Sequence, residues 1–176
     1  MKTKTRVANS YSILESLRLK NNLYLACSSN DYNYVWLRDS FYEVMPYLEL
    51  DSDEYERTYH RILDILNDYA FKFNPIYMKK PATVADYIHP RYCEEGKEIP
   101  VEWGNAQNDA TGAILYGIAK GEKFGKNIIR NEVDRKTVQN LVWYLNTCRY
   151  WEDLDNGMWE ENRELHMSSV GACLAG

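Results

Sequence analysis

Apolar residues recur at helical spacing along almost the whole of this chain, and that periodicity constrains its fold more than any other feature. The stripes follow the i, i+3, i+4, i+7 pattern of helices with one buried face. Six of them can be traced, over residues 7–17, 41–48, 55–73, 110–117, 138–148 and 170–174. Short strand pieces are expected at most around residues 76–77 and 99–101. The sequence therefore predicts an all-α fold.

Length, charge and cysteine usage exclude several classes of protein. The 176 residues suit one domain, over residues 1–176. A net charge of -5 gives no general attraction to phosphate backbones, so no nucleic acid is expected as a partner. No apolar run approaches the ~20 residues of a membrane span, and none follows the basic start as in a secretory signal. The four cysteines lack paired spacing, so reduced, mostly buried thiols and a cytoplasmic location are expected.

Three segments that mix tryptophan with carboxylates and amides lead into the second, fourth and sixth of the predicted helices. They cover residues 31–40, 101–112 and 155–164, and small or capping residues (Ser40, Asp109 and Ser168–Ser169) are expected to begin the helices that follow. In an up-and-down array, alternate helices point the same way. The three segments are therefore expected to meet at one end of the domain and to form a site there.

Each segment has a functional interpretation and a plain one. Arg38 and Asp39 can clamp ligand hydroxyls between Tyr32 and Trp36, or they can be a solvated arginine beside a helix-capping aspartate. Three such segments at one end of a helical array favour the functional interpretation, because a single segment of this kind would be weak evidence.

The second and third segments have the same two interpretations. Trp103 with Gln107 and Asp109 can form a stacking platform flanked by hydrogen-bonding groups, or a core tryptophan beside a cap. Glu160 stands next to Trp159 and a methionine, and apolar walls favour the protonated carboxyl group that a general acid needs.

Other common catalytic patterns are missing from the sequence. The three histidines have no carboxylate or cysteine at ligand spacing, so no metal site and no cofactor are expected. There is no GxSxG nucleophile motif and no phosphate-binding glycine loop. Gly117, Gly121 and Gly125 are expected to end a helix.

At these residues the sequence resembles glycoside hydrolase family 15, the glucoamylase-type enzymes, and the related barrel domain of the phosphorylase kinase alpha and beta subunits. Three motifs carry the resemblance: Asp31-Tyr-x-Tyr-x-Trp-x-Arg-Asp-Ser40, Trp103-Gly-x-x-Gln-x-Asp109 and Trp159-Glu160-Glu161. They are similar to the family's first substrate-binding box, its tryptophan loop and the box that holds its general acid. The resemblance implies an (α/α)6 barrel, of which this chain has the first half.

The resemblance also implies a role for each matching residue. Arg38 and Asp39 would hydrogen-bond the non-reducing glucose of an α-linked glucan or malto-oligosaccharide, and Tyr32 and Trp36 would line that ring. Trp103 would stack near the cleavage point, with Gln107 and Asp109 beside it. Glu160 would protonate the glycosidic oxygen. Its neighbours Trp159 and Glu161 would contact the substrate, with Glu161 binding the leaving sugar. Hydrolysis would invert the anomeric centre.

An inverting enzyme needs a second carboxylate as general base, about 6.5–9.5 Å from the acid. In the family the second half of the barrel supplies it, and a complete barrel needs roughly 190 residues or more. The last stripe stops within its pattern at Gly176, so a missing segment or a second chain is expected to complete the barrel, unless the chain is a remnant. Two alternatives to an enzyme stay open: a glucan-binding or regulatory module like the kinase subunits, and a helical scaffold without a ligand.

Overall fold

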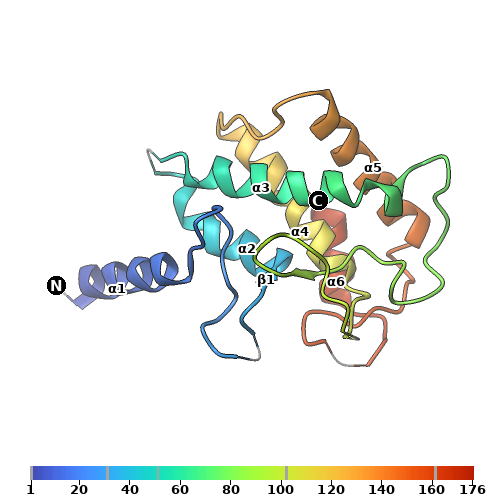
Figure 1. The fold of residues 1–176 in the computed structure, drawn as a ribbon, viewed down its shortest axis with the longest axis horizontal. Coiled ribbons are helices and arrows are strands. Elements are labelled where there is room, and N and C mark those ends of the chain that lie inside the picture. Colours follow the sequence, from blue (N-terminus) through green and yellow to red (C-terminus); the bar gives the residue numbers. More distant parts are fainter. Residues whose placement is uncertain (1, 31, 51, 102, 161) are drawn as a thin grey trace.

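The computed structural model describes residues 2–30, 32–50, 52–101, 103–160 and 162–176, and of residues 2–6 only the backbone. These residues form six α-helices, two short 3-10 helices and a two-stranded ribbon, which confirms the all-α prediction (Figure 1). In chain order the elements are α1 (Lys2–Leu17), β1 (Val35–Trp36), α2 (Leu37–Val44), η1 (Met45–Tyr47), α3 (Glu54–Asp68), η2 (Ala70–Phe73), β2 (Arg91–Tyr92), α4 (Asn108–Lys123), α5 (Glu132–Cys148) and α6 (Met167–Ala175).

Helix α4 is the central element of the fold, since it contacts α2, α3, α5 and α6. Its closest neighbour is α6, and small residues allow the approach. A Cβ atom built on Gly112 would lie 2.6 Å from the backbone of Ala172. One on Gly117 would lie 1.6 Å from the hydroxyl of Tyr59 on α3. These glycines therefore lie inside α4 for packing reasons, and the prediction that Gly117 and Gly121 end a helix is wrong.

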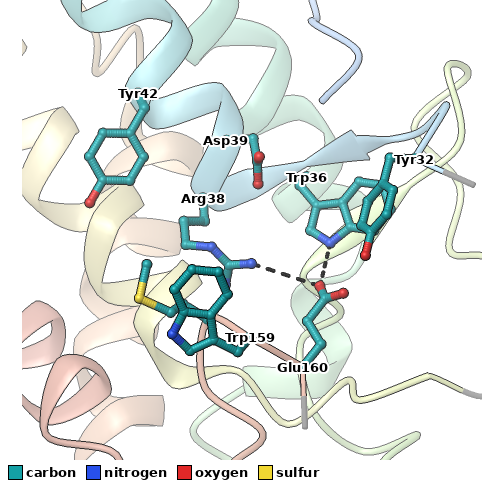
Figure 2. Close-up of a pocket in the computed structure, with 8 residues that line it drawn as sticks. Tyr32, Trp36, Arg38, Asp39, Tyr42, Trp159 and Glu160 are labelled. Atoms are coloured by element: carbon teal, nitrogen blue, oxygen red, sulfur yellow. Dashed lines mark hydrogen bonds and ion pairs between the residues drawn. The ribbon is translucent and has the colours of Figure 1, made fainter. Parts of the chain in front are cut away.

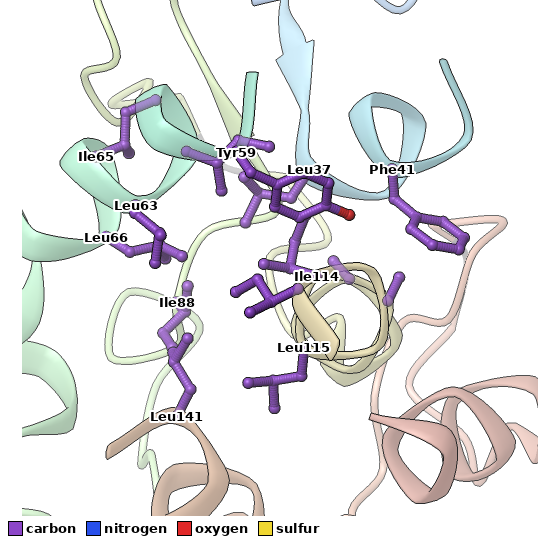
Figure 3. Packing of buried hydrophobic residues seen from close by; sticks show 14 of the residues in the cluster. Leu37, Phe41, Tyr59, Leu63, Ile65, Leu66, Ile88, Ile114, Leu115 and Leu141 are labelled. Carbon is purple, nitrogen blue, oxygen red and sulfur yellow. The ribbon is translucent and has the colours of Figure 1, made fainter. Parts of the chain in front are cut away.

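The hydrophobic core fills the space between α2, α3, α4 and α5 (Figure 3). Helix α3 buries the face that carries Tyr59, Ile62 and Leu66, and α5 adds Leu141. In the second half of α1, Tyr11, Leu14 and Leu17 pack against this core, and the helix projects from the body of the molecule (Figure 1). On α6, by contrast, Leu174 is exposed although its stripe predicts burial.

Each strand of the ribbon lies in a long segment between helices, β1 between α1 and α2 and β2 between η2 and α4. β1 pairs antiparallel with β2, with Val35 opposite Tyr92 and Trp36 opposite Arg91. Next to residues 99–101, Glu98 forms an isolated antiparallel bridge with Tyr92, but the prediction of a strand piece around 76–77 is wrong. Ile76 is exposed and lies in a turn, so it has no strand to pair with.

The even-numbered helices begin earlier than their predicted caps. Trp36, Gln107 and His166 precede the first residues of α2, α4 and α6, and none of them caps through its side chain. Ser40 and Asp109 instead lie inside the first turns of α2 and α4 and are buried. The three helix starts nonetheless lie together, because contacts described below join all three loops that precede them.

Candidate functional site

An open cavity of about 320 Å³ lies where α2 faces the loop before α6 (Figure 2). Its walls mix aromatic rings, one cation and two carboxyl groups, which is a composition suited to a ligand that presents both hydroxyl groups and an apolar ring face. The lining residues are Tyr32, Trp36, Arg38, Asp39, Tyr42, Met158, Trp159 and Glu160.

The ribbon and the first turn of α2 position one wall of this cavity. Trp36 is buried at the end of β1, and the amide of Leu37 donates a hydrogen bond to the carbonyl of Pro90 at 2.8 Å. The guanidinium of Arg91 on β2 lies 5.8 Å from the Trp36 ring and 4.3 Å from the Trp103 ring. A buried cation between two indole faces fixes both rings, because each offers it a negative π-surface. Burial also lowers the pKa of Arg91.

Glu160 is the residue on which the three segments converge. Its Oε1 accepts hydrogen bonds from Nε1 of Trp36 at 2.6 Å and from Nε2 of Gln107 at 3.1 Å. Its Oε2 accepts one from Nε1 of Trp103 at 2.7 Å. Arg38 adds an ion pair to Oε1 at 3.7 Å (Figure 2). Donors separated from Glu160 by 53 to 124 residues of chain therefore hold both of its oxygens.

The backbone at Glu160 is left-handed, with a φ of 60°. This conformation costs a residue other than glycine about 1–3 kcal/mol, and such residues gather at functional sites. Three side-chain hydrogen bonds to the carboxylate offset the cost here. Glu160 therefore combines a strained backbone with the carboxylate that binds all three segments.

Arg38 joins the first segment to the second. Its Nη1 donates to Oε1 of Gln107 at 2.8 Å and to Oδ2 of Asp109 at 2.9 Å. Since Gln107 also donates to Glu160, a continuous polar network runs from α2 through the start of α4 to the carboxylate. Its neighbour Asp39 faces the cavity, and burial raises the pKa of Asp39 against the lowering effect of the Arg38 guanidinium.

The structure sorts the predicted site residues into two groups. Tyr32, Trp36, Arg38, Asp39, Trp159 and Glu160 line the cavity. Trp103, Gln107 and Asp109 do not line it, and instead contact Glu160 or Arg38 from behind. Glu161 lies outside the described residues.

The surroundings of Glu160 also differ from the apolar walls predicted for it. Trp159 is 76% exposed and Met158 37% exposed, so the two form an open rim above the carboxylate. The atoms that contact the carboxylate are nitrogen donors. The reason is that the left-handed turn at Glu160 points its side chain away from its neighbours and towards the starts of α2 and α4.

Sequence analysis missed two residues of the site. Tyr42 lines the cavity from α2, one helical turn after Arg38, and the four-residue spacing of these positions was the available signal. Arg91 holds the indoles, and no local pattern pointed to it because its partners lie in distant segments.

Other kinds of site find little support in the described part of the chain. No group of three or more histidine, cysteine or acidic side chains there could hold a metal ion. None of its helices is both long and apolar enough to cross a membrane. All four cysteines are free thiols, but only Cys148 and Cys173 are buried, so the prediction of mostly buried thiols is half right.

The arrangement of the helices matches that of solved glycosidases, which gives the chain the same all-α fold class. A structure described as "Glycosidase Wild Type" matches with a TM-score of 0.76 and 19% identity, over 94% of this chain and 46% of that chain. A variant of a glycosidase in complex with glucose matches with a TM-score of 0.75 over the same shares. At this identity the likeness shows the fold, of which this chain spans about half.

The family follows from the sequence. The model of Glycosyl hydrolases family 15 matches residues 16–175, and the chain belongs to that family. Among curated proteins it is similar to the phosphorylase b kinase regulatory subunit alpha, liver isoform. The Mus musculus protein is 26% identical over 86% of this chain, and the Takifugu rubripes protein 33% identical over 55%. The chain covers only 14% and 8% of these relatives.

Proposed function

We propose that this chain is the acid-bearing part of a glucoamylase-like hydrolase, which releases glucose from the ends of α-linked glucans or malto-oligosaccharides with inversion. The observation that carries the proposal is the convergence of three N–H donors on Glu160 at the edge of an aromatic cavity. In this interpretation Glu160 protonates the glycosidic oxygen, the bond to the anomeric carbon breaks, and water adds to that carbon from the opposite face.

The donors around Glu160 would act on the carboxylate that forms as the proton leaves. Negative charge develops on the acid as it gives up its proton, and donors that are already in place stabilise that charge without reorganising. The indoles of Trp36 and Trp103 lie at 2.6 Å and 2.7 Å from the two oxygens, so both share the developing charge.

The rest of the cavity would bind the non-reducing glucose. Tyr32 and Trp36, whose ring centroids lie 5.4 Å apart, supply apolar faces for the sugar ring. Arg38 and Asp39 supply a donor and an acceptor for its hydroxyl groups. Glu161 would bind the leaving sugar. The general base would come from a further segment or a second chain that completes the barrel, since the solved glycosidases are about twice as long as the part matched here.

Replacing Glu160 with glutamine tests the proposal in a catalytically active form that includes the base. The amide keeps the shape but supplies no acidic proton, so the rate should fall by about 10²–10⁴-fold with little change in sugar binding. Glu164→Gln is the matched control, because Glu164 is an exposed glutamate of the same loop and should leave the rate unchanged. An unchanged rate in Glu160→Gln would remove Glu160 as the acid.

The named relatives favour a second candidate, a glucan-binding or regulatory module without hydrolysis, since they are regulatory subunits. Calorimetric titration with maltotetraose separates the candidates. Binding without turnover, in a form that includes the rest of the barrel, supports the module. No heat from a folded sample would favour a helical scaffold without a ligand. The free thiols are compatible with the cytoplasmic location that we propose for either.

A further inference from the structure

The loop between α5 and α6 carries Glu160 and is closed at its base. Asp155 and Glu164 pair through their backbones, with N–O distances of 3.0 Å and 2.9 Å in the two directions. Glu160 lies in the segment between them, and its carboxylate reaches across to Trp36 and Trp103. Whatever fixes the base of this loop therefore also fixes the position of that carboxylate.

The side chain of Asp155 joins this base to two helices. Its Oδ2 accepts a hydrogen bond from the backbone N of Asn108, the first residue of α4, at 3.0 Å. Its Oδ1 accepts from the hydroxyl of Ser169 on α6 at 3.1 Å and from the backbone N of Gly157 at 3.2 Å. The residue is 1% exposed, so water does not compete for these donors.

The contact to Gly157 lies inside the closed loop. Gly157 has a φ of 60°, which turns the chain sharply after Asp155 and sets the direction in which the segment with Glu160 leaves. Asp155 thus fixes the start of that segment against α4 and α6 at once. We propose that Asp155 is a positioning residue, which holds Glu160 against the indoles of Trp36 and Trp103. Its catalytic meaning rests on the function proposed above.

Asp153 provides the contrast. It is also buried, and it accepts hydrogen bonds from the hydroxyl of Tyr87 and from Nδ2 of Asn108, both at 2.9 Å, and pairs with Lys80 at 2.9 Å. Asp153 and these partners lie outside the closed loop, and they contact it indirectly, since the Tyr87 hydroxyl accepts a hydrogen bond from Arg163 of the loop at 2.8 Å and the backbone N of Asn108 donates to Asp155. Loss of Asp153 should therefore destabilise the protein and displace Glu160 less than loss of Asp155 does.

The variant Asp155→Asn tests the proposal. The amide would keep the shape of the side chain, but its NH₂ group would meet a donor where Asp155 offers only acceptors. The indole N–H signals of Trp36 and Trp103, recorded by ¹H–¹⁵N NMR on the chain, report directly on the Glu160 carboxylate. In Asp155→Asn both signals should move towards their positions in Glu160→Ala, whereas Asp153→Asn should move them much less.

Two wild-type indole signals in a folded Asp155→Asn protein would overturn the proposal. If that variant does not fold, Ser169→Ala replaces it, because it removes the α6 contact alone. A smaller displacement in the same direction then supports the proposal, and none overturns it.

The rate of hydrolysis, measured on a catalytically active form that includes the base, gives an independent readout. Asp155→Asn should lower kcat by about 10²-fold with little change in KM, as for a catalytic group displaced by about 1 Å. Displaced indole signals with an unchanged kcat would overturn the catalytic meaning of the position. A wild-type protein that binds no sugar and hydrolyses none would instead refute the proposed function, while the NMR result would still decide the positioning role.

Discussion

Replacing Arg38 with methionine should destabilise the fold more than any change to a surface ion pair. The Arg38 side chain is 11% exposed and that of Asp109 is 5% exposed, with 2.9 Å between Nη1 and Oδ2. Methionine keeps much of the volume but leaves the Asp109 carboxylate buried without its counter-charge. Breaking a buried pair in this way costs about 3–5 kcal/mol.

That free energy converts into a large thermal shift. A chain of this length loses about 2–4 °C of melting temperature per kcal/mol, so Arg38→Met should melt about 6–20 °C below the wild type. The control is Arg135→Met, which breaks an exposed pair with Glu132 (67% and 85% exposed) and should cost no more than about 1 kcal/mol. Thermal unfolding followed by circular dichroism measures both.

A double variant isolates the mechanism. If the cost comes from the uncompensated carboxylate, adding Asp109→Asn to Arg38→Met should restore part of the lost stability, since the buried charge is then gone. An Arg38→Met protein that melts within about 2 °C of Arg135→Met would refute the reasoning. It would mean that water or rearranged side chains compensate Asp109 well enough.

Two further stability changes follow from the packing and the titration of buried groups. Gly112→Ala should cost about 1–3 kcal/mol because its Cβ would lie 2.6 Å from the backbone of Ala172. Gly171→Ala, at an exposed position of α6 where a Cβ would meet nothing within 4 Å, should stabilise by up to about 1 kcal/mol, and equal melting temperatures of the two variants would contradict this. Burial, reinforced by the charge of Asp39, raises the pKa of Glu43 to about 8. Between the ordinary pKa of a glutamate and pH 8 the folded state therefore keeps a proton that the unfolded chain releases, so the free energy of unfolding falls as the pH rises towards 8. Glu43→Gln removes this loss and should flatten urea-unfolding free energies between pH 5 and pH 8, and an unchanged slope would show that Glu43 ionises freely.

The helices were predictable because each needs only a local apolar stripe. The predictions failed where the local structure depends on residues that are distant in the sequence. Tyr69 and Phe73 continue the stripe of α3, yet that helix ends at Asp68 and a 3-10 turn follows. The strands could not be found because two-residue strands have no pattern of their own and exist through their pairing. Gly117 and Gly121 were misread because a close helix contact and a helix end favour the same residue.

Most residues of the candidate site could be predicted from the sequence, but the hydrogen bonds between them could not. Counting helices was enough to bring the loops with Arg38, Gln107 and Glu160 to one end, since alternate helices of an array run in the same direction. The hydrogen bonds between them were beyond sequence analysis, because each depends on side-chain directions over 53 or more residues of chain. The exposed rim at Trp159 likewise depends on the left-handed backbone at Glu160, a conformation that glutamate as a residue type does not signal.

The left-handed backbone at Glu160 bears on how this chain can change over evolutionary time. Glycine adopts this conformation freely and asparagine with little strain, so either would relieve the fold of a cost that glutamate imposes. Either would also remove the three hydrogen bonds that offset this cost, and would leave the indole N–H groups of Trp36 and Trp103 without their acceptor. The residue at this position and the donors around it are therefore expected to change together, because the donors are what makes glutamate tolerable on this backbone.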